Sequence, residues 1–266
     1  MTSLDLSLPT PAENLALDEA LLDAAEAGVM GESLRFWESP THFVVVGYAN
    51  KVSTEVNAAA CERLGIPILR RCSGGGTVLQ GPGVLNYSLV LRITEGAALA
   101  GITSANQFIM QRNADAMTSL LIRSSGRESA PSDSPKSWSG LTSAATVQVQ
   151  GHTDLAINGL KFSGNAQRRK RDHLLFHGAI LLNLDLDLLE QVLPMPTLQP
   201  GYRASRSHRD FLTQLSVPAD SVKQALRAAW SADEPLELDS RWPGWRESVS
   251  GLVAGKYSAE AWNLRV

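Results

Sequence analysis

The sequence predicts one α+β domain, in which a mixed β-sheet is flanked by helices. Some segments carry apolar residues at helical spacing, and others are short runs of β-branched and aromatic residues typical of strands. The two kinds of segment do not alternate regularly, as a doubly wound parallel sheet would require. The 266 residues, 44% of them hydrophobic and 19% charged, are enough for one ordinary core.

The first helix is expected over residues 11–27, because Thr10 can cap it and Pro11 suits its first position. An Asn-Gly dipeptide at 158–159 predicts a tight hairpin turn. Further helices are expected over 54–64, 104–122, 186–193 and 221–230. Strands are expected over 34–37, 42–47, 68–71, 85–91, 147–149, 155–157, 160–163 and 174–183. Residues 123–143 are rich in Ser, Pro and Gly and predict a surface loop or an insertion.

Composition excludes several classes of protein. A net charge of -3 gives no general attraction to nucleic acid. The spacing of the two cysteines, Cys61 and Cys72, fits neither a disulfide framework nor a four-cysteine metal site, which indicates a reducing compartment. No secretory signal and no apolar run of about 20 residues are present, so we expect a cytoplasmic protein without a membrane span.

A glycine-rich stretch follows one predicted strand and has the sequence RRCSGGGT over residues 70–77. Glycines let a backbone approach a ligand closely and direct several N–H groups at one anion, and arginine offers a planar fork to phosphate or carboxylate. The stretch therefore predicts an anion-binding loop. The alternative, a mobile turn with solvated arginines, has about even weight from the glycines alone.

A second stretch, residues 153–166, surrounds the predicted Asn-Gly hairpin. Lys161 follows the turn and can direct its ammonium group at an anionic substrate, while Asp154 on the partner strand can orient that lysine or bind a metal ion. The alternative is a solvated lysine and a loop aspartate. His177 precedes a glycine in an apolar strand, which is more typical of a structural histidine than of a general base.

Together and in this order, the motifs resemble the lipoate–protein ligase A and octanoyltransferase family. The resemblance extends from Asn14 to about residue 215 and rests on segments 14–19, 46–50, 70–76, 86–88, 161–167 and 177–178. It implies the mixed sheet shared with biotin ligases and class II aminoacyl-tRNA synthetases. It also implies one catalytic domain over residues 1–266, with no separate C-terminal accessory domain.

The resemblance implies a role for each matching residue. Lys161 is the expected catalytic residue, which binds the acyl carboxylate or the acyl-phosphate oxygens. Arg70 and the glycine amides are expected to hold a phosphate, and Asp154 to lie near ATP and its Mg²⁺. The full set of expected binding residues is Arg70, Arg71, Ser73, Gly74, Gly75, Gly76, Thr77, Asn86, Asp154, Ser163, Gly164, Asn165, Ala166, His177 and Gly178.

Three functions remain open. The first is ATP-dependent attachment of lipoate or octanoate to a lysine through an acyl-adenylate, which is favoured because no cysteine lies just before Lys161 or near residues 200–202. The second is ATP-independent transfer from acyl carrier protein or an acylated domain, which the Gly-Pro-Gly at 81–83 favours. Cys72 is then the one thiol able to act covalently, although a small packing residue is the commoner role. The third is a non-catalytic protein that binds acyl groups or lipoyl domains.

The partners implied are lipoyl domains of 2-oxoacid dehydrogenases or the glycine cleavage H protein, and a separate accessory subunit if the ligase cycle is complete. Residues 123–143 and the basic run 168–171 are candidate docking surfaces, because a basic patch suits an acidic acceptor domain. No nucleic acid and no membrane are expected among the partners.

Overall fold

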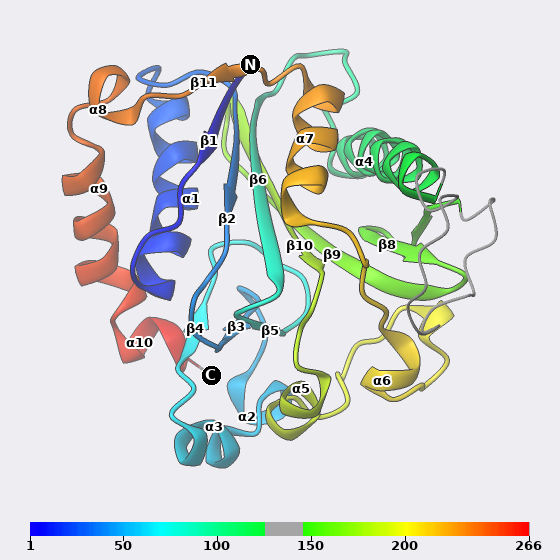
Figure 1. Cartoon of the computed structure of the whole chain (residues 1–266). Coiled ribbons are helices and arrows are strands. Elements are labelled where there is room, and N and C mark those ends of the chain that lie inside the picture. Colours follow the sequence, from blue (N-terminus) through cyan, green and yellow to red (C-terminus); the bar gives the residue numbers. More distant parts are fainter. Residues whose placement is uncertain (126–145, 266) are drawn as a thin grey trace.

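The computed structural model describes residues 1–125 and 146–265, and an eight-stranded mixed sheet lies at its centre (Figure 1). The strand order is β11-β1-β2-β6-β10-β9-β8-β7, with β11, β1 and β2 parallel and the other pairs antiparallel. The strands are β1 (Thr2–Asp5), β2 (Ser33–Trp37), β6 (Val84–Arg92), β7 (Gln148–Gln150), β8 (Asp154–Ile157), β9 (Leu160–Arg169), β10 (His173–Leu181) and β11 (Glu234–Pro235).

A smaller three-stranded sheet lies beside one end of the large sheet (Figure 1). Its central strand β3 (Phe43–Val46) pairs in parallel with β4 (Ile68–Arg70) and antiparallel with β5 (Val78–Gln80). Its apolar residues pack on α3 (Ala58–Leu64) and α5 (Leu186–Val192) in a core of their own. The two sheets thus leave a space between them that helices do not fill.

Helices cover both faces of the large sheet. On one face α1 (Pro11–Glu26) packs with the C-terminal helices, and on the other α4 (Ile102–Ser125) packs with α7 (Ala219–Trp230) (Figure 1). The remaining helices are α2 (Val52–Glu55), η1 (Gly201–Arg203), α6 (His208–Phe211), α8 (Leu238–Arg241), α9 (Trp245–Leu252), η2 (Val253–Tyr257) and α10 (Glu260–Asn263). No helix in the described part of the chain is long and apolar enough to cross a membrane.

Helix α1 begins where the sequence predicts, with a complete capping box. Thr10 accepts a hydrogen bond from the Glu13 amide, and the Glu13 carboxylate accepts one from the Thr10 amide. Five residues after Glu13, Asp18 forms a 2.6 Å ion pair with Arg35 of β2, and the Arg35 side chain is fully buried. The pair therefore fixes α1 against the sheet.

The α+β class, with a mixed sheet and flanking helices, is confirmed, but three expectations were wrong in detail. The helix expected over 54–64 is two helices, because the chain is extended at Val56 and Asn57 then caps the second helix by accepting from the Ala60 amide. The residues after 230, for which the sequence predicted no helix, form α8 to α10, since Trp245, Val249 and Tyr257 bury against α1. Strands β1 and β5 were not foreseen. Residues 123–125 end α4, and the remainder of the loop expected to 143 lies outside the described residues.

Asn has nearly the same shape as Asp but no charge, so replacing Asp18 by Asn removes the counter-charge of a buried guanidinium. We expect Asp18→Asn to lower the free energy of unfolding by about 3–5 kcal/mol, because Arg35 is left charged and unpaired in the core. Asp23→Asn on the same helix is the control. Its half-exposed pair with Lys170 is expected to contribute less than about 1 kcal/mol. Equal losses in urea denaturation of the two variants would contradict this role for Asp18.

Candidate active site

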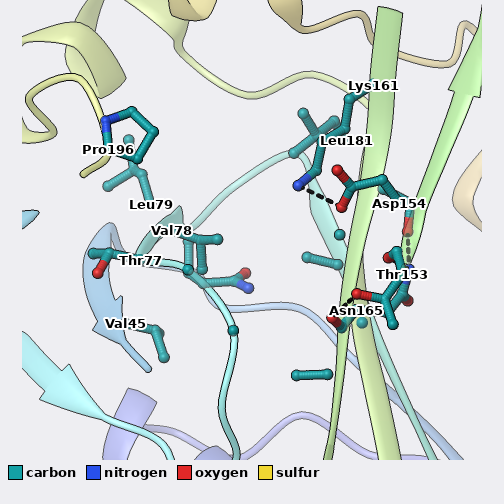
Figure 2. A pocket seen from close by; sticks show the side chains of 18 of the residues that line it. Val45, Thr77, Val78, Leu79, Thr153, Asp154, Lys161, Asn165, Leu181 and Pro196 are labelled. Atoms are coloured by element: carbon teal, nitrogen blue, oxygen red, sulfur yellow. Dashed lines mark hydrogen bonds and ion pairs between the residues drawn. The ribbon is translucent and has the colours of Figure 1, made fainter. Parts of the chain in front are cut away.

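A cavity of about 620 Å³ lies between the two sheets. Its polar side consists of residues from β8, β9 and β10, and its apolar side of residues from β3 and β5 together with Pro194, Pro196 and Leu198 after α5. Figure 2 shows the two sides facing each other, with Lys161, Asp154 and Asn165 opposite Val45 and Val78. The cavity therefore offers a polar reacting end next to an apolar wall.

Lys161 and Asp154 form an ion pair in this cavity, with Nζ 2.7 Å from Oδ1. The hairpin places them together: Asn158 and Gly159 both have positive φ, and the turn returns β9 along β8. Gly164 leaves room for the ammonium group, because a Cβ there would stand 2.8 Å from Nζ. The lysine side chain is 24% exposed, so it is accessible from the cavity while held by its partner.

Tyr202 completes this pair from a loop that sequence reasoning did not select. Its hydroxyl donates a 2.8 Å hydrogen bond to Oδ2 of Asp154. Burial raises the pKa of Tyr202 well above its usual value, and the Asp154 carboxylate adds to that shift, so the phenol stays protonated and remains a donor. Both oxygens of Asp154 are thus engaged, one by an ammonium and one by a hydroxyl.

The glycine-rich loop is shaped by Arg71. Nη2 of this arginine donates to the carbonyl oxygens of Gly74 and Gly76 at 2.5 and 2.7 Å. Burial lowers the pKa of Arg71 to about 10, which still leaves it charged at neutral pH. Gly75, Gly76 and Thr77 line the cavity. The guanidinium therefore acts as an internal brace of the loop, with its donors directed at the chain.

Arg70 lies elsewhere. It is fully buried, and the cavity lining does not include it. Its donors reach the main-chain carbonyl oxygens of Gly47, Tyr48, Asn50, Trp262, Asn263 and Arg265. The structure therefore does not bring Arg70 together with Lys161, and its guanidinium anchors the C-terminal helices to β4.

A buried network supports the loop from below. Ser73 Oγ and His177 Nε2 lie 2.5 Å apart, and His177 Nδ1 is 3.6 Å from Asp18 Oδ2. Burial alone would raise the pKa of Asp18, but Arg35 and His177 outweigh it and lower that pKa. Ser73 is 1% exposed and lies behind the lining, whereas His177 and Asp18 reach it.

Asn165 is positioned by contacts on both sides. Its Oδ1 accepts from the Tyr87 hydroxyl at 2.6 Å, and its Nδ2 donates to the Thr153 carbonyl at 2.8 Å. Gly178 has to be glycine here, since a Cβ would lie 1.7 Å from Asn165 Oδ1. Of the residues expected from the sequence, those on the cavity are Arg71, Gly75, Gly76, Thr77, Asn86, Asp154, Lys161, Ser163, Gly164, Asn165, Ala166, His177 and Gly178, and those outside its lining are Arg70, Cys72, Ser73 and Gly74.

Cys72 is turned away from the cavity. It is 3% exposed and packs in the core beneath α1, near Tyr257. Burial raises its pKa to about 12, with Glu19 adding to the shift, so it is a thiol and not a thiolate at neutral pH. Cys61 lies in α3 and is also buried. Neither cysteine of the sequence reaches the site where acyl chemistry could occur.

Asp154 does not fit the magnesium ligand that the resemblance implies. Its two oxygens are taken by Lys161 and Tyr202, and the adjacent ammonium group opposes a second cation. Across the described residues, no three His, Cys, Asp or Glu side chains form a group that could hold a metal ion. The site as folded is built for an anion.

Sequence reasoning missed the whole wall that follows α5. Pro194, Pro196, Leu198 and Arg203 line the cavity from this segment, and Leu198 is 89% exposed at its edge. Glu55 fastens the wall by accepting a hydrogen bond from the Thr197 amide at 3.3 Å. The closely spaced prolines at 194, 196 and 200 were a signal of a rigid extended segment, but nothing local indicated where it would lie.

Comparison with known proteins identifies the family. The model of the lipoyl protein ligase A/B catalytic domain matches residues 10–231. A protein named octanoyltransferase LipM from Carboxydothermus hydrogenoformans is 32% identical over 96% of this chain and 94% of its own length. Another of that name from Geobacillus kaustophilus is 29% identical over 98% and 97%.

Solved structures give the same result. A lipoate-protein ligase A bound with ATP is 25% identical with a TM-score of 0.74, covering 99% of both chains. A bi-partite lipoate protein ligase from Thermoplasma acidophilum, described with its E2 lipoyl domain, has a TM-score of 0.75 at 23% identity, over 99% of this chain and 95% of its own. This chain is therefore an enzyme that belongs to the lipoyl protein ligase A/B catalytic domain family.

Proposed function

We propose that this enzyme transfers an octanoyl or lipoyl group from an acyl thioester to a lysine of a lipoyl acceptor domain, without ATP. The observation that carries the proposal is the Lys161–Asp154 pair facing an apolar cavity. The near full-length likeness to proteins named octanoyltransferase supports it. The ligase solved with its E2 lipoyl domain supports an acceptor of that kind. Lipoyl domains of 2-oxoacid dehydrogenases and the glycine cleavage H protein are the proposed acceptors.

In this reaction the acceptor amine attacks the thioester carbonyl carbon, the C–S bond breaks, and the thiol leaves with the proton that the amine loses. Negative charge grows on the carbonyl oxygen as the amine attacks. The Lys161 ammonium is held in place to stabilise that charge, because Asp154 and Tyr202 fix its position before the substrate arrives. The apolar wall disfavours a second ammonium and so favours a neutral acceptor amine.

The two arginines favour transfer without ATP. Both were expected to bind substrate or nucleotide, with Arg70 at the phosphate, yet the donors of Arg70 and most donors of Arg71 bond main-chain carbonyl oxygens. Opening these bonds to admit a nucleoside triphosphate would break charge-assisted hydrogen bonds that are at least partly buried, which is costly. The likeness to a ligase bound with ATP favours a second candidate, ATP-dependent ligation through an acyl-adenylate.

The choice between these two functions can be made with one acceptor. We expect a lipoyl domain to gain an octanoyl group from octanoylated acyl carrier protein with no nucleotide present, and to gain little from octanoate, ATP and Mg²⁺. Intact-protein mass spectrometry of the acceptor measures both. An octanoylated lipoyl domain serves as a third donor and tests transfer between domains. Modification that occurs with ATP alone would establish the second candidate instead.

Lys161→Met removes the ammonium but keeps an unbranched side chain. We expect the transfer rate to fall by about 10²–10³-fold, the usual loss when one preorganised donor to an oxyanion is removed. The KM for the donor should change little, because the interaction strengthens only in the transition state. The control is Lys170→Met, at a half-exposed lysine paired with Asp23 outside the cavity lining. If both variants transfer at the same rate, Lys161 is not catalytic.

Cys72→Ala tests for a covalent intermediate. We expect the transfer rate to stay within about twofold of the unmodified enzyme, because the thiol is buried, protonated and outside the cavity lining. Iodoacetamide at pH 8 should label Cys72 slowly in the native protein and readily after denaturation, which is the internal control. A protein mass that increases by one acyl group on incubation with donor alone would refute direct transfer.

A further inference from the structure

Arg203 is a buried cation in the cavity that the proposed reaction does not yet use. It ends η1 in the segment after α5, is 4% exposed, and lines the cavity. Its Nε donates to the carbonyl oxygen of Arg206 at 3.1 Å, and its guanidinium carbon lies 4.8 Å from the centre of the Phe211 ring. Backbone and ring thus fix the guanidinium in one orientation.

One end of this guanidinium has no partner. Nη2 of Arg203 is buried and makes no hydrogen bond to any residue that the structure describes. No carboxylate in the described ranges lies within ion-pairing distance of it. Burial lowers the pKa of Arg203, and its cationic neighbour Arg206 lowers it further. A buried guanidinium without a counter-charge is costly, so its retention needs an explanation other than stability.

The charged groups nearby are already engaged. Asp154 is bonded to Lys161 and Tyr202, and Glu55 to Thr197. Arg206 directs Nη2 to the carbonyl oxygens of Gly159 and Tyr202, at 2.9 and 2.8 Å. His208, which also lines the cavity, is held neutral because burial lowers its pKa. Arg203 is left as the cation in this wall with a free donor.

The position of Arg203 indicates which anion it could meet. It directly follows Tyr202, whose hydroxyl bonds Asp154, so it lies on the Lys161 side of the cavity and not at the glycine-rich loop. A free fatty acid has one anionic end, which Lys161 can already accommodate. A second cation in the same cavity suits a substrate that carries an anionic group at a distance from its reacting carbonyl. A phosphate ester is such an anion, and it matches the forked donors of a guanidinium.

We propose that Arg203 binds the phosphate ester of the activated acyl donor. The inference rests on the proposed function, in which that donor is a thioester on a phosphopantetheine arm. An acyl-adenylate carries the same chemical group, so the guanidinium would also serve the second candidate function. Arg203 is thereby a binding residue that selects activated donors over simple thioesters.

Binding without the acceptor tests this apart from turnover. The probes are S-octanoyl-4′-phosphopantetheine, S-octanoylpantetheine, which lacks the phosphate, and AMP, each titrated by calorimetry. We expect Arg203→Met to weaken binding of the phosphorylated thioester by about tenfold or more, the usual effect of losing a hydrogen bond to a charged group. Binding of the phosphate-free thioester should change by less than about twofold, because its contacts are untouched. Arg203→Lys should fall between the wild type and Arg203→Met.

The matched control is Arg209→Met, on the neighbouring helix α6. Arg209 is half-exposed, pairs with Asp187 and Glu190, and lies outside the cavity lining. The Arg209→Met variant should bind all three probes as the wild type does. The melting temperature of Arg203→Met should be unchanged or higher, because the substitution removes an uncompensated buried charge. If Arg203→Met does not fold, Arg203→Lys carries the comparison.

Each outcome decides something. If Arg203→Met weakens binding of both thioesters equally, Arg203 is structural and the inference is overturned. The same holds if the melting temperature falls and Arg203→Lys shows no preference for the phosphorylated thioester. An unchanged affinity for every probe would also overturn the inference. If AMP alone depends on Arg203, the residue still binds a phosphate ester, but transfer without ATP fails. If Arg203 selects the phosphorylated thioester while no thioester supports transfer, the inference stands and the proposed function falls.

Discussion

The buried ion pair between Asp18 and Arg35 is the interaction on which the rest of the site depends. The Asp18 carboxylate neutralises Arg35 inside the core, accepts from Ser88 at 2.8 Å, and faces His177, which in turn holds Ser73 of the glycine-rich loop. One side chain therefore connects helix α1, the three strands β2, β6 and β10, and the loop. Because a buried charge must be matched wherever it is placed, these elements can pack in only one relative arrangement. The cavity takes its shape from that arrangement.

Four arginines of the chain have different roles because their surroundings differ. Arg35 neutralises a carboxylate, Arg70 and Arg71 satisfy main-chain carbonyl groups, and Arg203 keeps a donor that no residue in the described part of the chain bonds. The carbonyl acceptors of Arg70 include residues of the C-terminal helices, nearly two hundred positions away. A guanidinium can bind an external anion only when the fold has not already used its donors.

This explains how far the sequence could predict the molecule. Local signals were sufficient for α1, with its capping box, and for the Asn-Gly hairpin that brings Lys161 beside Asp154. The glycine-rich loop was also visible, because two arginines and three successive glycines stand together there, and Gly75 and Gly76 do line the cavity. The direction of a long side chain is not a local property, so the partners of Arg70 and the inward position of Cys72 could not be read from their neighbours.

The same limit applies to the wall after α5. Its residues are ordinary by composition, and Tyr202 meets Asp154 only because the segment folds back across β8 and β9. The break between α2 and α3 is also local: Val56 is extended, and the Asn57 side chain then caps α3 by accepting from the Ala60 amide. Strand and helix patterns therefore predicted the class of the fold better than they predicted the inventory of the site.

The lack of a thiol in the cavity, together with the cavity's volume, bears on how the substrates of the proposed transfer bind. Both cysteines of the sequence are buried away from the cavity, so no thiol is available to hold an acyl group while one substrate leaves and the next arrives. In the proposed transfer, donor and acceptor therefore have to be present together. A volume of about 620 Å³ lies well within the range of about 300–1,000 Å³ typical of ligand cavities. Under that proposal, the acceptor lysine and the arm of the donor meet in this cavity beside Lys161.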